Sequence, residues 1–309
     1  MSARAKLRLG TRGSELARTQ SGTMAAALER LGLAVELTII KTSGDQNTTS
    51  TFASIGPQGV FVREIEQALV ERRIELAVHS FKDLPTKSPP ELVIAAVPAR
   101  VDPADLLLVR RDALAGAADD WLPLKTGARV GTASARRRAW LKHFRPDLVV
   151  EPLRGNVPTR VRRLEEGRFD AIVLAAAGVE RLQAEQRLGS ALADVAVLKL
   201  DPKRFVPAPA QGALAVQCRL DDARVLEALA AIDDAPSRAA VTAERDALAR
   251  AEGGCDVAFG AYCFAANGTH SLVAMLERAG AVRSAQVEGA DPRTLGAAAW
   301  TKLDAAVRR

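Results

Sequence analysis

The stretch VREIEQALVERRIELAVHSFKDLP, residues 62–85, combines the patterns on which the fold prediction rests. Its apolar residues first recur at helical spacing, which predicts an amphipathic helix over Val62–Arg72. A short apolar run over Ile74–His79 then predicts a buried strand, and Pro85 stops regular structure soon afterwards. A helix that leads directly into a buried strand is typical of a βαβ unit, so we expect a largely parallel sheet covered by helices on both faces.

The same alternation of strands and helices extends over the first two hundred residues and runs twice, over 1–100 and 101–200. Pro103 and Pro202 mark the places where the chain crosses between the two halves. The other expected strands are Lys6–Gly10, Val35–Lys41, Leu92–Val97, Asp105–Val109, Arg129–Gly131, Leu148–Pro152 and Ala171–Leu174, and the other expected helices are Ser14–Leu31 and Val157–Glu166.

From Asp221 the pattern becomes richer in helices and predicts a third, smaller α+β domain. The domain prediction is therefore an α/β domain over 1–100 with 201–220, a second α/β domain over 101–200, and an α+β domain over 221–309. Its expected elements are the helices Arg224–Ile232, Ala239–Arg250 and Pro292–Val307 and the strands Val257–Ala265 and Leu272–Leu276.

Composition excludes several classes of protein. The chain has 309 residues, of which 48% are hydrophobic and 26% charged, so it is neither disordered nor of low complexity. Aromatic residues make up 4%, too few for a surface that stacks single-stranded bases. No apolar run approaches the roughly 18 residues that span a membrane, and the N-terminus lacks the apolar segment of a secretory signal. We expect a cytoplasmic protein that does not act at a membrane.

Cysteine usage argues against disulfides and metals. Cys218, Cys255 and Cys263 are an odd number in a long chain and form no CxxC pair, and no histidine stands at metal-ligand spacing from them. Cys218 and Cys263 lie on strand patterns and are interpreted as core residues. Cys255 follows Gly253 and Gly254 on a turn, which makes it the candidate reactive thiol.

The formal net charge of +6 is compatible with a nucleic-acid binder, a solvated basic surface or a cleft that neutralises a small polyanion. The positions of the arginines favour the cleft, because they follow strands, and ligands of open α/β sheets gather at the carboxyl ends of strands. A single arginine there is ordinarily a solvated surface residue, and it is the repetition that points to a ligand with several carboxylates. These arginines are Arg12, beside the predicted helix cap Ser14, and Arg136, Arg137, Arg154 and Arg160.

Two further segments carry candidate chemistry. Ser80, Lys82 and Asp83 come directly after a buried strand, and a carboxylate at position 83 is suited to stabilising a transient cation. The alternative is an exposed Lys–Asp pair with no catalytic role, and His79 is interpreted as a core histidine. The polar, glycine-rich stretch Ser43–Gly59 is interpreted as a lid over the site, with disorder as the alternative.

Six segments in order, from residue 6 to about residue 262, resemble the porphobilinogen deaminase (hydroxymethylbilane synthase) family. They are RLGTRGSELARTQ, GVFVREIEQALVERRIELAVHSFKDLP, VGTASARRRAWL, LRGNVPTRVRRLEEGRFDAIVLAAAGVERL, PAPAQGALAVQCR and AERDALARAEGGCDVAFGAY. The resemblance implies two periplasmic-binding-protein-like α/β domains plus a smaller C-terminal α+β domain. It also implies a monomeric transferase of tetrapyrrole (haem) biosynthesis, which deaminates and joins four porphobilinogen molecules head to tail and releases hydroxymethylbilane and ammonia.

The resemblance also implies a role for each matching residue. A dipyrromethane cofactor would be attached covalently through Cys255, and Asp83 would stabilise the cation left when ammonia departs. No metal is implied. The residues implied to bind the cofactor are Ser80, Lys82, Thr132, Ser134, Arg136, Arg137, Arg154 and Arg160, and those implied to bind substrate are Arg12, Ser14, Phe61 and Arg181. The alternatives are a two-lobed anion-binding protein without catalysis and a nucleic-acid binder, which the scattered arginines disfavour.

Overall fold

The computed structural model describes residues 6–40, 62–116, 121–184, 192, 194–251, 258–266 and 268–307. Ser43–Gly59, Phe61 and Cys255 lie outside the described residues, so the structure does not test the predictions made for them. The chain forms two compact units. The first consists of Met1–Val101 with Ala213–Val241, and the second of Asp102–Gly212 with Thr242–Arg309.

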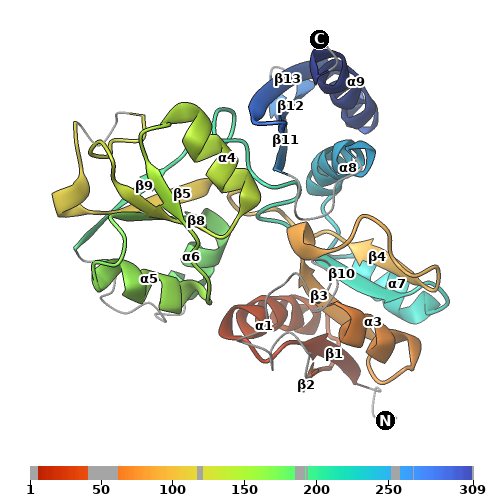
Figure 1. Cartoon of the computed structure of the whole chain (residues 1–309). Coiled ribbons are helices and arrows are strands. Elements are labelled where there is room, and N and C mark those ends of the chain that lie inside the picture. The colour runs from red at the N-terminus through yellow and green to blue at the C-terminus, as the bar shows by residue number, and fades with distance from the viewer. Residues whose placement is uncertain are drawn as a thin grey trace. The chain divides into compact units, whose positions relative to one another are not determined.

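A five-stranded sheet in the order β2-β1-β3-β10-β4 forms the centre of the first unit (Figure 1). Leu76 and Val78 of β3 join a buried cluster with residues of α1 and α7, whereas Ala77, between them, joins a cluster with residues of α3. Because alternate residues of a strand face opposite sides, α1 and α7 cover one face of this sheet and α3 covers the other. The elements are β1 (Leu7–Thr11), α1 (Glu15–Arg30), β2 (Val35–Ile39), α3 (Arg63–Val70), β3 (Leu76–Ser80), β4 (Leu92–Ala96), β10 (Leu214–Arg219) and α7 (Ala223–Ala230).

The second unit contains another five-stranded sheet, in the order β7-β6-β8-β5-β9, with α4 and α5 on opposite faces (Figure 1). Trp140 of α4 is fully buried in its core, and the indole Nε1 donates to the carbonyl oxygen of Val206 at 2.8 Å. The elements are β5 (Asp105–Arg110), β6 (Arg129–Gly131), α4 (Ala135–Phe144), β7 (Val149–Glu151), α5 (Val157–Glu165), β8 (Ala171–Ala175), α6 (Ala176–Ala184) and β9 (Val195–Lys199).

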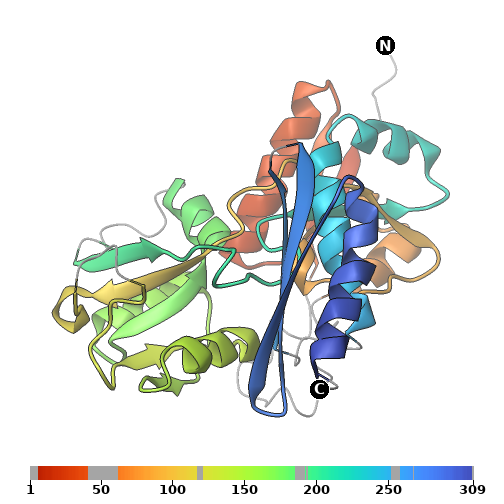
Figure 2. The ribbon, with the colours of Figure 1, turned by 90° about the horizontal axis from the view of Figure 1, so that it is seen from above.

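A three-stranded antiparallel sheet completes the second unit, and α9 lies along it (Figure 2). Val273 and Met275 of its central strand belong to the same buried cluster as Trp140, so this sheet shares the hydrophobic core of the second unit. The elements are β11 (Phe259–Ala266), β12 (Thr269–Arg278), β13 (Ala281–Gly289) and α9 (Leu295–Val307), while α8 (Ala235–Arg250) runs from the first unit into the second. The fold-class prediction of two α/β parts and a smaller C-terminal α+β part is confirmed.

The expectation of largely parallel sheets is wrong for the fourth strand of each five-stranded sheet. β10 runs antiparallel to β3 and β4, and β5 runs antiparallel to β8 and β9. Both strands follow a connecting segment without a crossover helix, so the rule that links βαβ units to parallel pairing does not apply to them. The expected repetition is present, because the two sheets share one strand order and one pattern of directions.

Candidate functional site

The carboxyl ends of β1 and β3 lie side by side in the first unit, because the two strands are parallel neighbours. Arg12 follows β1 and is half-buried. Ser14 caps α1, and the hydroxyl oxygen accepts a hydrogen bond from the backbone nitrogen of Ala17 at 3.4 Å. The predicted cap is therefore present, and it places the N-terminus of α1, where negative charge is favoured, at this edge of the sheet.

The segment after β3 holds the other candidate residues of the first unit. β3 ends at Ser80 and continues into a 3-10 helix over Phe81–Asp83. Lys82 is half-buried, whereas Asp83 is exposed, so a ligand can reach the carboxylate. The short helix presents these two polar side chains at the edge that also holds Arg12, as the strand order requires.

Gln20 on α1 fixes Ser80 and was not identified from the sequence. Its side chain is 5% exposed, its Nε2 donates to Ser80 Oγ at 3.0 Å, and Ser80 Oγ lies 3.3 Å from Gln20 Oε1. A buried glutamine within a helix is the signal that could have found it, because a buried amide requires a partner. Ser80 therefore has a fixed side chain at the end of its strand.

Behind this edge lies a polar chain through the core of the first unit. His79 Nε2 and Gln217 Oε1 are 3.0 Å apart, and Gln217 Nε2 donates to Glu66 Oε1 at 3.0 Å. Burial lowers the pKa of His79 to about 4, against a weaker opposing effect of the bond to Gln217, and burial raises the pKa of Glu66. The interpretation of His79 as a core histidine is confirmed, since its side chain is 7% exposed and bonded.

In the second unit, β6 is parallel to both β7 and β8, so three carboxyl ends lie together at one edge. Ser134 caps α4 there, accepting from the backbone nitrogen of Arg137 at 3.3 Å. Thr132 Oγ1 accepts from the backbone nitrogen of Ser134 at 3.2 Å and so shapes the turn before the helix. This turn directs the N-terminus of α4, and the arginines of its first turn, toward the edge of the sheet.

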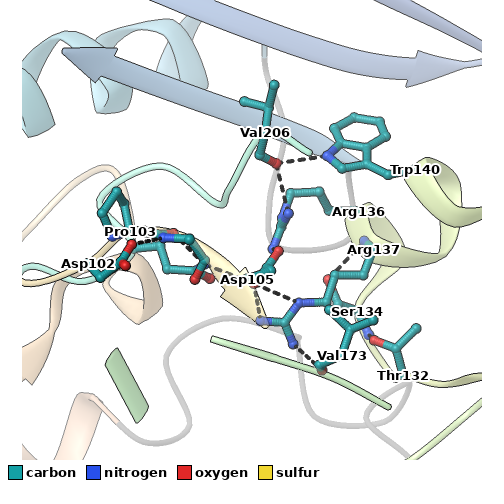
Figure 3. A network of polar contacts seen from close by, with 12 residues as sticks. Asp102, Pro103, Asp105, Thr132, Ser134, Arg136, Arg137, Trp140, Val173 and Val206 are labelled. Atoms are coloured by element: carbon teal, nitrogen blue, oxygen red, sulfur yellow. Dashed lines mark hydrogen bonds and ion pairs between the residues drawn. The ribbon is translucent and has the colours of Figure 1, made fainter. Parts of the chain in front are cut away.

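Asp105 binds two arginines of that first turn, Arg136 and Arg137 (Figure 3). It accepts from Arg136 Nη2 at 2.9 Å and from Arg137 Nε and Nη2 at 3.1 and 2.7 Å. The remaining Nη1 groups donate to the carbonyl oxygens of Val206 and Val173, at 2.8 and 3.0 Å. Burial by itself would raise the pKa of Asp105, but the two guanidinium charges outweigh it and hold that pKa well below its usual range.

This network also ties the start of β5 to the segment before β10. Gln211 Nε2 donates to Asp105 Oδ1 at 2.9 Å and to the carbonyl oxygen of Pro103 at 2.8 Å. Asp105 is fully buried and Gln211 is 1% exposed. Sequence reasoning missed both residues, although an aspartate that opens an apolar strand is itself a signal, because a buried carboxylate requires cationic partners.

Arg160, on α5, adds a third cation close to this pair. Burial and, to a smaller extent, the positive charge of Arg137 together lower its pKa to about 10. The Nε donates to the carbonyl oxygen of Gly155 at 2.8 Å, and no carboxylate within the described ranges pairs with Arg160. Asp105 pairs with two of these three guanidiniums, which leaves a surplus of two positive charges in a partly buried place.

The turn that leads into α5 depends on Gly155, whose φ of +114° L side chains rarely adopt. A Cβ there would lie 2.9 Å from the methyl group of Thr159. Asn156 then caps α5, its Oδ1 accepting from the backbone nitrogen of Thr159 at 2.9 Å. The exposed Arg154 stands immediately before this turn, at the carboxyl end of β7.

Arg181 completes the cations of the second unit that the sequence predicts. It lies on α6, the helix that follows β8 directly, and is half-buried. Its Nη2 donates to the carbonyl oxygen of Gly212 at 3.2 Å, and burial lowers its pKa. Arg154 and Arg160 follow β7, as the sequence pattern predicts, and Arg181, which the resemblance implied, follows β8 on the other side of β6.

The described residues contain no group of three or more His, Cys, Asp and Glu side chains that could hold a metal ion. No helix in the described part of the chain is long and apolar enough to cross a membrane. Cys218 and Cys263 are buried and form no disulfide within the described residues, and burial raises the pKa of the Cys218 thiol to about 11, which agrees with their interpretation as core residues.

Comparison with known proteins gives one consistent family. Residues 7–227 match the family model described as "Porphobilinogen deaminase, dipyromethane cofactor binding domain". A porphobilinogen deaminase of Syntrophobacter fumaroxidans is 45% identical over 272 residues, covering 87% of this chain and 84% of the relative. One from Brevibacillus brevis is 42% identical over 298 residues, covering 94% of this chain and 91% of the relative.

Among solved structures, a periplasmic VFT2 domain of Bordetella pertussis BvgS aligns with a TM-score of 0.42 and 14% identity, covering 72% of this chain and 85% of that domain. A periplasmic binding protein of Salmonella typhimurium with high arginine specificity aligns with a TM-score of 0.39 and 12% identity, covering 74% of this chain and 92% of that protein.

Proposed function

Because the chain belongs to the porphobilinogen deaminase family, we propose that Asp83 is its catalytic carboxylate and that the arginines at the strand ends hold the carboxylates of its ligands. The chain is a transferase that joins four porphobilinogen molecules head to tail on a dipyrromethane primer and releases hydroxymethylbilane and ammonia. The cofactor-binding match and the names of the relatives favour this activity over a two-lobed anion-binding protein without catalysis.

The single observation that supports the binding part of the proposal is the charge surplus around Arg137 and Arg160. A guanidinium that is largely desolvated and repelled by a neighbour gains more than an ordinary one when a ligand carboxylate pairs with it. Porphobilinogen carries an acetate and a propionate, so each added pyrrole brings two negative charges. The donor set therefore fits a primer and a product chain that carry many carboxylates.

The proposed site residues fall into those that would bind the cofactor and growing chain and those that would bind incoming substrate. When bound, the dipyrromethane supplies the pyrrole on which the chain is built. Ser80 and Lys82 would position it by donating hydrogen bonds, and Thr132 and Ser134 would add hydroxyl groups beside the N-terminus of α4. The residues proposed to pair with carboxylates of primer and chain are Arg136, Arg137, Arg154 and Arg160, and those proposed to hold incoming substrate are Arg12, Ser14, Phe61 and Arg181.

Arg136 and Arg137 would contribute to ligand binding mainly through their positive charge, because Asp105 already binds both side chains. Their chief contribution would be a fixed positive field at the first turn of α4, while Arg160, whose side chain bonds only a backbone carbonyl within the described residues, would make the direct pairing. The network with Gln211 holds this field in place without neutralising it.

Asp83 would act through the negative charge of its carboxylate. Loss of ammonia from porphobilinogen leaves a cation on the substrate-derived pyrrole, and a carboxylate about 4 Å away stabilises it by about 4 kcal/mol at an effective dielectric constant near 20. That corresponds to roughly a thousandfold in rate. The same carboxylate would hold the pyrrole N–H protons while the new bond forms and the α-proton leaves. Cys255 would be the attachment point of the primer.

Substitution Asp83→Asn tests this proposal, because it keeps the shape and removes the charge. We expect KM for porphobilinogen to change little and kcat to fall by about a thousandfold, measured as ammonia release by the holoenzyme. Glu91→Gln, at an exposed acid before β4, is the matched control and should leave both constants unchanged. A kcat for Asp83→Asn within a few-fold of the unsubstituted enzyme would contradict the catalytic role.

The proposal includes a monomeric state and a cytoplasmic location. Sedimentation equilibrium of the holoenzyme tests the first, and fractionation of cells that express the full chain tests the second. A stable dimer, or recovery with membranes, would overturn the corresponding part.

A further inference from the structure

A cavity of about 290 Å3 lies in the second unit, away from the cations at the start of α4. It is bounded by the C-terminal end of α4, the segment after β9 and the face of β12 and β13. Because α4 has ten residues and each adds about 1.5 Å, roughly 15 Å of helix separates this cavity from the Ser134 cap. It is therefore distinct from the arginine cluster described above.

The floor of the cavity is apolar and its rim is cationic. Val273, Met275 and Val282 belong to or pack against the core of the second unit and form the floor. Lys203 and Arg204 stand on the rim, and both are exposed. Among the described residues, no acidic side chain lines this cavity. The lining thus combines two positive charges with a hydrophobic surface, and His143, Ser284 and Gln286 add polar groups.

The two cations are held against aromatic rings rather than against carboxylates. Lys203 Nζ lies 4.4 Å from the centre of the Phe264 ring, and Arg204 Cζ lies 4.0 Å from the centre of the Trp121 ring. Arg204 also lies 5.7 Å from the Phe144 ring, which itself lines the cavity. In the part of the chain that the structure describes, neither cation forms an ion pair, so the contacts with rings orient them without neutralising them.

This combination selects a class of ligand. An inorganic anion would satisfy the charges but leave the apolar floor exposed to water, whereas an uncharged apolar molecule would leave the cations unpaired. A flat ring with one or two carboxylates satisfies both, and the volume lies near the lower end of the range of small-molecule sites. We propose that this cavity binds a small aromatic carboxylate through Lys203 and Arg204, at a site separate from that of the substrate.

Calorimetric titration of the full-chain holoenzyme with benzene-1,2-dicarboxylate (phthalate) tests the proposal. Phthalate is expected to bind, while sulfate and benzyl alcohol, which carry only the charge or only the ring, bind at least about tenfold more weakly. Arg204→Gln and Lys203→Met should each weaken phthalate binding by about tenfold or more. Both residues are exposed, so these variants should fold, and thermal unfolding checks that they do.

Arg283→Gln is the matched control, because Arg283 is an exposed arginine of β13 whose Nη1 donates to its neighbour's carbonyl oxygen and which does not line the cavity. Its binding of phthalate should be unchanged. The absence of measurable heat at millimolar phthalate would overturn the proposal, and so would sulfate binding as tight as that of phthalate. Binding that survives Arg204→Gln and Lys203→Met but is lost in Arg160→Leu would assign phthalate to the arginine cluster instead and would equally overturn it.

Discussion

Arg160 occupies a position that disfavours its own charge. Burial and the nearby Arg137 lower its pKa to about 10, and its side chain bonds only the carbonyl oxygen of Gly155 among the described residues. A residue that served stability alone would be expected in the opposite situation, paired as Arg137 is with Asp105. The arrangement fits the proposed role of Arg160, which would pair with a ligand carboxylate.

Replacement Arg160→Leu should separate binding from stability. Loss of a charge-assisted bond of about 1.5–3 kcal/mol should lower kcat/KM for porphobilinogen by about ten- to a hundredfold. The midpoint of thermal unfolding should stay the same or rise, because a repelled and desolvated charge has been removed. Arg162→Leu, on the same helix but exposed and paired with Glu166 at 3.7 Å, is the control and should keep its kcat/KM. A lower unfolding midpoint of Arg160→Leu with unchanged kinetics would assign Arg160 to structure.

His79 makes the stability of the protein depend on pH. Its pKa is about 4 in the folded protein, below the ordinary value of 6.5, so the unfolded chain takes up a proton first as the pH falls. The free energy of unfolding should therefore drop as the pH falls from 6.5 toward 4, by about 2 kcal/mol between pH 7 and pH 5. Urea unfolding at both pH values measures it. His79→Leu should lack this component, and an equal drop in the variant would show that another group is responsible.

At the scale of elements, the N-terminus of α4 contains a helix cap and is also the proposed binding surface for ligand carboxylates. Ser134 accepts the backbone hydrogen bond of Arg137, and Thr132 fixes the backbone of Ser134 in turn. The cap is needed for the helix, and the hydroxyl and helix N-terminus are proposed to meet ligand carboxylates. Two substitutions at one position can distinguish these contributions.

Ser134→Ala should lower the free energy of unfolding by about 1 kcal/mol, because the cap is lost. Ser134→Asp should restore that stability, since aspartate caps helices well and lies at the positive end of the helix dipole. The new negative charge should nevertheless repel ligand carboxylates and raise KM for porphobilinogen. Urea unfolding and steady-state kinetics on the same samples measure both effects. A Ser134→Asp enzyme with an unchanged KM would exclude carboxylates from this helix end.

Most of these elements were predictable because their signals are local. The expected helix Ser14–Leu31 is found at Glu15–Arg30, and the expected strand Arg129–Gly131 has the observed bounds. The direction of β5 and β10 was not predictable in this way, because pairing across long stretches of chain leaves no periodicity in either strand. β13, which alternates polar and small residues over Ala281–Gly289, was missed for lack of an apolar face.

In the candidate site, too, local features were predictable from the sequence and contacts between distant residues were not. Strand ends and helix caps placed Arg12, Ser14 and Ser134 at the edges of their sheets, and these placements follow from short motifs. The Asp105 interaction with Arg136 and Arg137 joins residues more than 30 positions apart, and only the folded sheet brings them together. The sequence therefore predicted at which strand ends the cations lie, but not which of them have a partner within the fold.

At the scale of the whole molecule, one strand order is used twice. Each five-stranded sheet ends its parallel strands beside helix N-termini, which carry Ser14 in the first unit and Ser134 and Asn156 in the second. Helix N-termini and arginines at such edges favour anions. This repetition suits a transferase whose bound chain gains two carboxylates with every pyrrole. Both sheets then present positive charge at the edge where such a chain would lie. The three-domain division remains a prediction, because the compact units number two.

Intact-protein mass spectrometry tests the central claim, that the chain builds its product on a primer attached at Cys255. The purified enzyme should carry the added mass of two linked pyrroles, and mixing it with porphobilinogen should give further species, each heavier by one pyrrole. Cys255→Ala should show the mass of the bare polypeptide before and after mixing. A purified enzyme that forms hydroxymethylbilane while its own mass stays that of the bare polypeptide would contradict the claim.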